Sequence, residues 1–306
     1  MKGIVIELDQ TDIPEAAERP AAIGERLAAY LELTKPRITF LIVLTSAAAF
    51  CLGAKGALDY FTLFHTLFGI AILSSGIATL NQYMERDLDS QMRRTAARPL
   101  PAGKLKPSQA LSFGLVLTVA AEIYLAAFVN LLTAALGGLV IVGYLLCYTP
   151  LKTRTSLSTV VGAFPGAMPP LLGWAGATGR IGLEAWVLFA ILLLWQCPHF
   201  LAIALMYRED YARAGIVMLP VVEPEGLLTR RQIVLWTVIL LPVSLLPSAL
   251  GTSGAIYFCG AFVLSVLFLW SSVAAALSTT RRSARRLLLV SVLYLPALFG
   301  LMVLDR

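Results

Sequence analysis

Long apolar runs, separated by short polar segments, make up most of the chain. A helix needs about 20 apolar residues to span the hydrocarbon core of a bilayer. Nine runs of roughly this length can be marked, at residues 38–54, 60–80, 109–128, 131–148, 159–178, 184–206, 232–250, 254–277 and 287–304. The pattern predicts an all-α, polytopic membrane protein with nine transmembrane helices.

Composition agrees with this prediction. Of the 306 residues, 58% are hydrophobic and 14% are charged, whereas charged residues make up about a quarter of a soluble protein. The runs leave no room for a separate soluble domain, so we expect a single transmembrane domain over residues 28–306. Residues 1–27 contain several acids and no long apolar run, which argues against a cleaved signal peptide. We expect a disordered cytoplasmic tail there, followed by a short interfacial helix.

The basic residues predict how the chain is oriented. If the nine runs alternate across the membrane, only Lys55, Arg180 and Arg306 of the 24 lysines and arginines lie opposite the amino terminus. Lysine and arginine are enriched in cytoplasmic loops. The amino terminus is therefore predicted to be cytoplasmic, and the longer loops on that side are expected to hold the active site. The net charge of +6 then reflects membrane orientation and does not indicate a nucleic-acid partner.

One polar segment, "NQYMERDLDSQMRRTAARPLPAG" at residues 81–103, follows the second run. Residues four apart lie on one face of a helix, so Asn81, Glu85 and Asp89 are expected to stack turn upon turn. Carboxylates held this closely repel each other unless a cation lies between them, and oxygen ligands of this kind suit Mg²⁺ with bound phosphate. The same segment carries the arginines Arg86, Arg93, Arg94 and Arg98. Guanidinium groups pair well with phosphate, although a solvated helix end with ordinary ion pairs would also explain the pattern.

A second acidic pair, Glu209 and Asp210 in "MYREDYARAG", follows the sixth run on the same predicted side. Two acidic clusters facing each other across a basic vestibule would hold two Mg²⁺ ions around a diphosphate. The hypothesis is a membrane enzyme that ionises an allylic diphosphate. The four cysteines lie singly without CxxC spacing, which makes a disulfide framework or a zinc site improbable.

Several blocks together resemble the UbiA-type intramembrane prenyltransferases, and their details are similar to the haem-modifying branch of that family. These blocks are the segment at 81–103, "LTKPRIT" (33–39), "YTPLKTRTSLSTVVGAFPGAMPPLLGW" (148–174), "WQCPHFLAIALMYREDYARAGIVMLP" (195–220) and "TRRQI" (229–233). The resemblance covers about residues 28–304. It implies a nine-helix bundle around a lipid-open central cavity, with cytoplasmic loops capping the active site.

The implied reaction is Mg²⁺-dependent transfer of farnesyl from farnesyl diphosphate to the 2-vinyl group of haem B, with addition of water, to give haem O. The implied location is a bacterial inner (plasma) membrane. The implied role is in cytochrome oxidase biogenesis, with membrane lipid around the protein and haem-biosynthesis or oxidase-assembly proteins as further partners.

The resemblance also implies roles for individual residues. Asn81, Glu85 and Asp89 would bind one Mg²⁺, and Glu209 with Asp210 would bind a second or position its waters. Additional diphosphate contacts are expected from Lys152, Arg154, Lys35 and Arg37, although anchoring at the inner leaflet explains these four equally well. Two positions depart from the family. Met206 stands four residues before Asp210, where the wider family often has Asp, and Ser158 stands where haem-branch relatives commonly have Asn.

The block "WQCPHF" supplies candidates for haem binding. His199 lies within the sixth run, where an ionisable side chain indicates function, and imidazole is a common axial ligand of haem iron. A neutral histidine bonded to a neighbouring helix is the alternative. Trp195 would stack on the porphyrin or serve as an ordinary bundle aromatic. His65 is expected to be interfacial, and Glu122 to be protonated or paired without a catalytic role.

Other functions remain open at this point. A related prenyltransferase could act on another aromatic or tetrapyrrole acceptor, but "WQCPHF" and the missing second DxxxD argue against it. A transporter would use the acids as a cation or proton site, yet the charged residues gather on one predicted side. An assembly factor for a respiratory oxidase would tolerate Glu85→Gln or Asp89→Asn.

Overall fold

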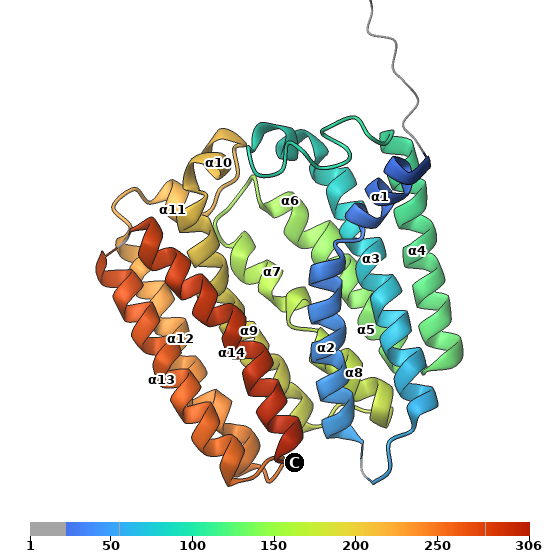
Figure 1. Cartoon of the computed structure of the whole chain (residues 1–306), viewed down its shortest axis with the longest axis vertical. Helices are drawn as coiled ribbons and strands as arrows, with labels where there is room; N and C mark the ends of the chain where they lie inside the picture. The colour runs from blue at the N-terminus through green and yellow to red at the C-terminus, as the bar shows by residue number, and fades with distance from the viewer. Residues whose placement is uncertain (1–22, 55, 279) are drawn as a thin grey trace, which may run out of the picture.

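The computed structural model describes residues 23–54, 56–278 and 280–306, and within these ranges it contains helices and no β-strand (Figure 1). In chain order the helices are α1 (Ile23–Leu33), α2 (Pro36–Gly53), α3 (Tyr60–Gln91), α4 (Pro107–Phe128), α5 (Leu131–Ile141), the π-helix η1 (Val142–Tyr148), α6 (Thr149–Leu151), α7 (Ser158–Gly166), α8 (Pro169–Thr178), α9 (Leu183–Met206), α10 (Arg208–Arg213), α11 (Leu219–Val222), α12 (Leu227–Ala249), α13 (Ala255–Ser278) and α14 (Arg281–Leu304). The predicted all-α class is confirmed.

Eight helical segments of the described chain are long and apolar enough to cross a membrane. They are α2, α3, α4, the continuous segment Leu131–Leu151, α9, α12, α13 and α14. The predicted span at 159–178 is instead divided between α7 and α8, so a count of nine is not confirmed. The break has a local cause, because Gly166 ends α7 and Pro169 begins α8, and proline has no backbone N–H for a continuous helical ladder.

The divided segment lies in the middle of the bundle. In Figure 1, α7 lies between the group α12, α13 and α14 on one side and the group α2, α3 and α4 on the other, and α8 lies behind the lower part of α2. The largest cluster of buried apolar residues is centred on α8 and α9, with Leu171, Leu188 and Ile191 among its fully buried members. Backbone irregularity at membrane depth is tolerated where protein surrounds it, and this packing provides those surroundings.

The polar segments gather at one end of the bundle. Figure 1 shows α1, α6, α10, α11 and the loop at residues 92–106 at the upper end, with the carboxyl terminus at the opposite end. Helix α3 has 32 residues, a length of about 48 Å at 1.5 Å per residue. The hydrocarbon core is about 30 Å thick, so α3 can cross it and continue for about three turns.

The amino-terminal boundary differs from the prediction. Residues 23–27, which were assigned to a disordered tail, form the start of α1, while the rest of that predicted tail lies outside the described residues. The predicted short helix before the first span is present as α1. It packs on α3 and the following loop through Ala29 and Leu33, which are buried with Leu100 and Leu105.

Candidate active site

The final turns of α3 carry a buried row of three polar side chains. Asn81, Glu85 and Asp89 are 2%, 7% and 1% exposed, as their spacing of four on one helix face requires. Burial of two carboxylates is costly unless they are paired or bind a cation. The row therefore needs partners of opposite charge from other parts of the chain.

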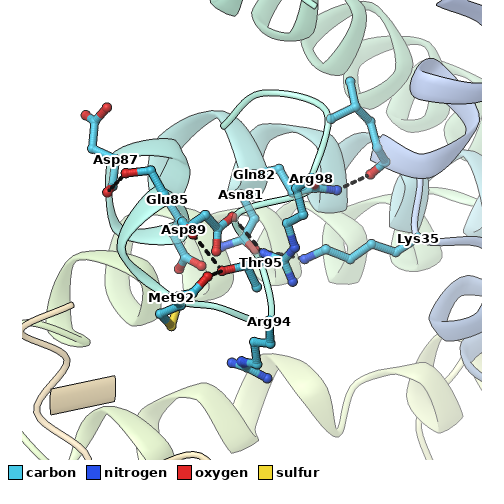
Figure 2. A network of polar contacts seen from close by, with 12 residues as sticks. Lys35, Asn81, Gln82, Glu85, Asp87, Asp89, Met92, Arg94, Thr95 and Arg98 are labelled. Atoms are coloured by element: carbon cyan, nitrogen blue, oxygen red, sulfur yellow. Dashed lines mark hydrogen bonds and ion pairs between the residues drawn. The ribbon is translucent and has the colours of Figure 1, made fainter. Parts of the chain in front are cut away.

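Three cationic side chains from three separate segments supply those partners. The contacts are Lys35 Nζ to Asn81 Oδ1 at 3.1 Å, Lys152 Nζ to Glu85 Oε1 at 2.5 Å, and Arg98 Nη1 to Asp89 Oδ2 at 2.7 Å. Figure 2 shows Lys35 and Arg98 extending from different segments toward Asn81. Three cations against two carboxylates leave a net positive site, which favours an anionic ligand.

The backbone at Lys35 is held in an unusual conformation. Its φ of 48° places it in the left-handed region, which costs a residue with a side chain of order 1–3 kcal/mol. Gln82 Nε2 donates to the carbonyl oxygen of Leu33 at 3.0 Å and thereby ties the end of α1 to α3. Pro36 begins α2 immediately afterwards. This turn directs the Lys35 ammonium toward Asn81.

The surroundings act in opposite directions on the two lysines. Burial, followed by the positive charge of Arg98, lowers the pKa of Lys35 to about 8. Burial also favours the neutral form of Lys152, but Tyr148, Glu85 and Tyr144 outweigh it and raise the pKa of that ammonium group. Lys152 is consequently a permanent cation at neutral pH, and most Lys35 side chains are also protonated there.

These side chains surround a polar cavity with about 750 Å³ of empty volume. Its charged and amide lining consists of Lys35, Asn81, Glu85, Asp89, Arg94, Arg98 and Lys152. Arg94 enters from the loop after α3, where its Nη2 donates to the Tyr211 hydroxyl at 2.7 Å. Its guanidinium carbon also lies 5.1 Å from the Tyr207 ring centre and 4.9 Å from that of Tyr211, which fixes it through cation–π contacts.

Four other predicted diphosphate ligands do not line this cavity. Arg86 donates to the carbonyl oxygen of Tyr83 at 2.8 Å and lies 3.7 Å from Asp87. Arg37, Arg93 and Arg154 are exposed. The position of Arg86 follows from helix geometry, since adjacent residues differ by about 100° around the axis and Glu85 is the residue that faces inward.

The second acidic pair is at the same end of the bundle but outside the cavity lining. Asp210 is buried, and its Oδ1 accepts from Arg213 Nη1 at 3.1 Å, whereas Glu209 is exposed. The two acidic segments do touch, because Arg213 Nη1 also donates to the carbonyl oxygen of Gln91 at 3.3 Å. Helix α9 ends at Met206 and α10 starts at Arg208, so the acids do not continue the inward face of α9. Glu209 and Asp210 therefore do not share the cavity that Asn81, Glu85 and Asp89 line.

The haem candidates lie between α9 and α14. His199 Nδ1 contacts Ser291 Oγ at 2.8 Å, and its ring stacks on Trp195 with 4.7 Å between ring centres. Trp195 Nε1 donates to the carbonyl oxygen of Ser291 at 2.7 Å. Neither side chain lines the polar cavity. Within the described residues, His199 Nε2 has no hydrogen-bond partner.

Two further titratable residues of the spans lie elsewhere. His65 Nδ1 contacts the Tyr124 hydroxyl at 2.5 Å, and its ring stacks on Phe128. Glu122 has one buried oxygen, Oε1, without a hydrogen-bond partner among the described residues, and it approaches α5 near Gly137. Neither residue lines the polar cavity.

Sequence reasoning missed the aromatic side of the site. Tyr144 and Tyr148 line the polar cavity from η1, and Lys152 Nζ lies 4.5 Å from the Tyr148 ring centre. Thr149 Oγ1 accepts from Asn81 Nδ2 at 3.2 Å. The spacing of four between Tyr148 and Lys152 in "YTPLK" was the available signal. The residue pattern of η1 does not distinguish a π-helix from an α-helix, although π-helical turns occur frequently at functional sites.

A second, apolar cavity adjoins the polar one. It has about 680 Å³ of empty volume, and its lining includes Ile42, Ile70, Leu73, Ile77 and Leu172 from α2, α3 and α8. Lys35 and Tyr144 line both cavities. The polar cavity and the apolar cavity are therefore neighbours, with Lys35 and Tyr144 at their shared border.

Comparison with known proteins agrees with this arrangement. Residues 42–295 match the model of the UbiA prenyltransferase family. The chain is 51% identical over 286 residues to the protoheme IX farnesyltransferase of Solibacter usitatus (strain Ellin6076), covering 90% of this chain and 98% of that protein. It is 47% identical to the protoheme IX farnesyltransferase of Koribacter versatilis (strain Ellin345), covering 96% and 97% of the two chains.

Solved structures share the fold at low sequence identity. A digeranylgeranylglyceryl phosphate synthase superposes with a TM-score of 0.74 at 17% identity, covering 92% of this chain and 98% of that chain. A UbiA homologue from Archaeoglobus fulgidus bound to DMAPP and Mg²⁺ gives a TM-score of 0.62 at 16% identity, covering 89% and 98%. On the extent of the family match and of its curated relatives, the chain belongs to the UbiA prenyltransferase family.

Proposed function

We propose that this membrane prenyltransferase transfers the farnesyl group of farnesyl diphosphate to the 2-vinyl group of haem B, with addition of water, to give haem O. The observation that carries the proposal is the pair of adjoining cavities, one cationic and one apolar. A prenyl diphosphate has the same division between a charged head and an apolar tail. The names of the similar curated relatives support haem as the acceptor.

The charges of the polar cavity support diphosphate binding. Lys35, Arg98 and Lys152 are already directed at the acidic row, and Arg94 adds a fourth cation to the lining. Ammonium and guanidinium groups form strong charge-assisted hydrogen bonds with phosphate oxygens. The apolar cavity would bind the tail, and burial of about 15 carbons contributes up to roughly 10 kcal/mol before ordering costs.

The acidic row fits Mg²⁺ when substrate completes the coordination shell. Asn81, Glu85 and Asp89 offer hard oxygen atoms, and Asp89 Oδ1 is buried without a hydrogen-bond partner in the described chain. Over the same residues, no group of three or more His, Cys, Asp or Glu side chains is placed to hold a metal ion. Mg²⁺ commonly keeps waters and takes phosphate oxygens beside one or two carboxylates, which matches this donor set. Glu209 and Asp210 would act at most through a second ion or its waters.

When bound, Mg²⁺ supplies positive charge next to the departing diphosphate. The residues of the chain bind the diphosphate and shield the reacting carbon from water. The four cations stabilise the negative charge that develops on the diphosphate. The C1–O bond then breaks, and its electron pair leaves on oxygen. The apolar walls exclude water from the allylic cation. The vinyl π-electrons of haem then form the new carbon–carbon bond, and a water molecule adds to the resulting cation and loses a proton.

The haem would approach from the side of α9. Ser291 holds Nδ1 of His199, and the stacked Trp195 fixes the ring plane, an arrangement that leaves Nε2 for the iron. A haem spectral shift present in the wild type and absent from folded His199→Ala would support this contact. An unchanged spectrum in that variant would exclude it.

The orientation is part of the same proposal. The distribution of lysine and arginine favours a cytoplasmic amino terminus, with the active-site end of Figure 1 on the same side. A bacterial inner membrane is what the family resemblance implies. Haem-biosynthesis or oxidase-assembly proteins would then supply the acceptor or receive the product.

One reconstitution tests the reaction. Purified protein in detergent is incubated with haem B, farnesyl diphosphate and Mg²⁺, and the pigments are followed by mass. The expected product is haem carrying farnesyl plus water, lost on chelation of the metal. Glu85→Gln and Asp89→Asn should lose activity while remaining folded. Asp87→Asn is the matched control, because Asp87 lies on the same helix with its side chain 81% exposed. Full activity in Asp89→Asn, or in the presence of a chelator, would refute the proposed site.

A further inference from the structure

Two residues border both cavities of the site. Of the described residues, Lys35 and Tyr144 are those that line the polar and the apolar space together. Under the proposed function, a bound prenyl diphosphate would have its phosphates on the polar side of this border and its hydrocarbon on the apolar side. The C1–O bond, where head and tail meet, then lies between Lys35 and Tyr144. This placement rests on the proposed function.

The ring of Tyr144 is held in place from its own helix. Tyr148 packs against it edge-on, with 5.1 Å between ring centres and 64° between ring planes. Thr149 Oγ1 donates to the Tyr144 carbonyl oxygen at 2.9 Å, and this contact fixes the η1 backbone that carries the ring. A side chain restrained in this way is suited to face a reacting atom, because positioning contacts reduce reorganisation during the reaction.

The two tyrosines of η1 differ in what their rings contact. Lys152 Nζ lies over the Tyr148 ring, 4.5 Å from its centre. In the described part of the chain no lysine or arginine lies over the ring of Tyr144. The electron-rich face of an aromatic ring attracts a cation within about 6 Å. At the junction, the cation that forms during the reaction is the allylic carbon itself.

We propose that Tyr144 is a catalytic residue whose aromatic ring faces C1 of the bound prenyl diphosphate and stabilises the allylic cation. The C1–O bond breaks with both electrons leaving on diphosphate. The positive charge spreads over C1 and C3 beside the ring, and the acceptor's π-electrons then form the bond to C1. The ring gains and loses no electrons or protons. Lys35, on the other side of the junction, contacts the departing oxygen.

Two substitutions at Tyr144 distinguish the contribution of its aromatic ring to kcat from that of its hydroxyl. Tyr144→Phe should retain kcat within about threefold of the wild type, because the ring remains. Tyr144→Leu should lower kcat by about 10- to 100-fold, the upper part of the cation–π range in a dehydrated site. The KM for farnesyl diphosphate should change by less than about threefold, since the phosphate contacts are intact. Wild-type kcat in Tyr144→Leu would overturn the proposal.

Graded fluorination of a phenylalanine at position 144 provides a second measurement that does not depend on folding of the leucine variant. Each fluorine weakens the ring's attraction for a cation with little change in shape. We expect log kcat to fall stepwise with fluorine number, whereas the same series at Phe262, an exposed ring on α13, should leave kcat constant. A flat series at 144 would exclude the cation–π role.

Released diphosphate and farnesylated haem are measured in the same reaction. The two measurements distinguish a failure of this proposal from a failure of the proposed function. If the wild type releases diphosphate from farnesyl diphosphate with Mg²⁺ but forms no farnesylated haem, the acceptor assignment fails. The fluorine series then reports on Tyr144 through diphosphate release to water. A wild type that releases no diphosphate under any of these conditions would overturn both.

Discussion

Gly173 of α8 lies against the Ser46 backbone of α2, and it offers a direct test of how the apolar cavity is built. A Cβ atom added at this glycine would lie 2.0 Å from the Ser46 carbonyl oxygen and 2.7 Å from its carbonyl carbon. Ordinary carbon–oxygen contacts are about 3.3 Å or longer, so Gly173→Ala must separate the two helices by more than about 1 Å. The obstacle is backbone, which cannot rotate away.

The expected stability loss of Gly173→Ala is the difference between two opposing contributions. Overpacking costs about 1–3 kcal/mol, and a backbone clash belongs at the upper end. Replacing glycine by alanine inside a helix returns about 1 kcal/mol. The net loss for Gly173→Ala is therefore about 2 kcal/mol, a decrease in Tm of about 4–8 °C. Pro169 and Leu172 on α8 line the apolar cavity, so the KM for farnesyl diphosphate should also rise.

Gly138→Ala is the matched control for this experiment. Gly138 is also helical, and an added Cβ would meet nothing within 4 Å, so this variant should have an unchanged or slightly raised Tm. Both variants are compared with the wild type by thermal unfolding in one detergent, followed by kinetics. Equal Tm values for the two alanine variants would show that α8 and α2 do not approach as closely as described.

Two further predictions concern charged groups. Arg98→Gln should lower the free energy of unfolding by about 2 kcal/mol, because it removes the partner of the buried Asp89 carboxylate and the 27% exposure of Arg98 reduces this effect only modestly. Mg²⁺ should raise the Tm of this variant more than that of the exposed control Arg93→Gln. An equal rise in both variants would contradict the pairing of Arg98 with Asp89. Slight burial favours a higher pKa for Glu223, but hydrogen bonds from Leu228 N and from Thr229 outweigh it and lower the pKa below 4.5. Because the folded pKa is the lower one, the stabilisation is present above pH 4.5 and is lost as the pH falls through the folded value. The Tm difference between the wild type and Glu223→Gln should therefore shrink in acid, and a difference that grows there would reverse this sign.

Much of the architecture was determined by sequence alone, because hydrophobic length and helical periodicity are local properties. Apolar runs of membrane-spanning length were sufficient to predict a polytopic helical protein. The spacing of Asn81, Glu85 and Asp89 was sufficient to place them on one face of α3. The division of 159–178 into α7 and α8 was not predicted, because the apolar run itself is unbroken.

The tertiary structure alone decided which side chains meet. The eight predicted cationic ligands were equivalent by charge. The structure places four of them in the lining of the polar cavity (Lys35, Arg94, Arg98 and Lys152) and four outside it (Arg37, Arg86, Arg93 and Arg154). The direction of a side chain depends on its position around the helix axis and on packing between segments that are distant in sequence. The charge of a residue gives no information about either. The same reason explains why Glu209 and Asp210 lie outside the cavity, and why Tyr144 on an unpredicted π-helix lies at the junction of the two chambers.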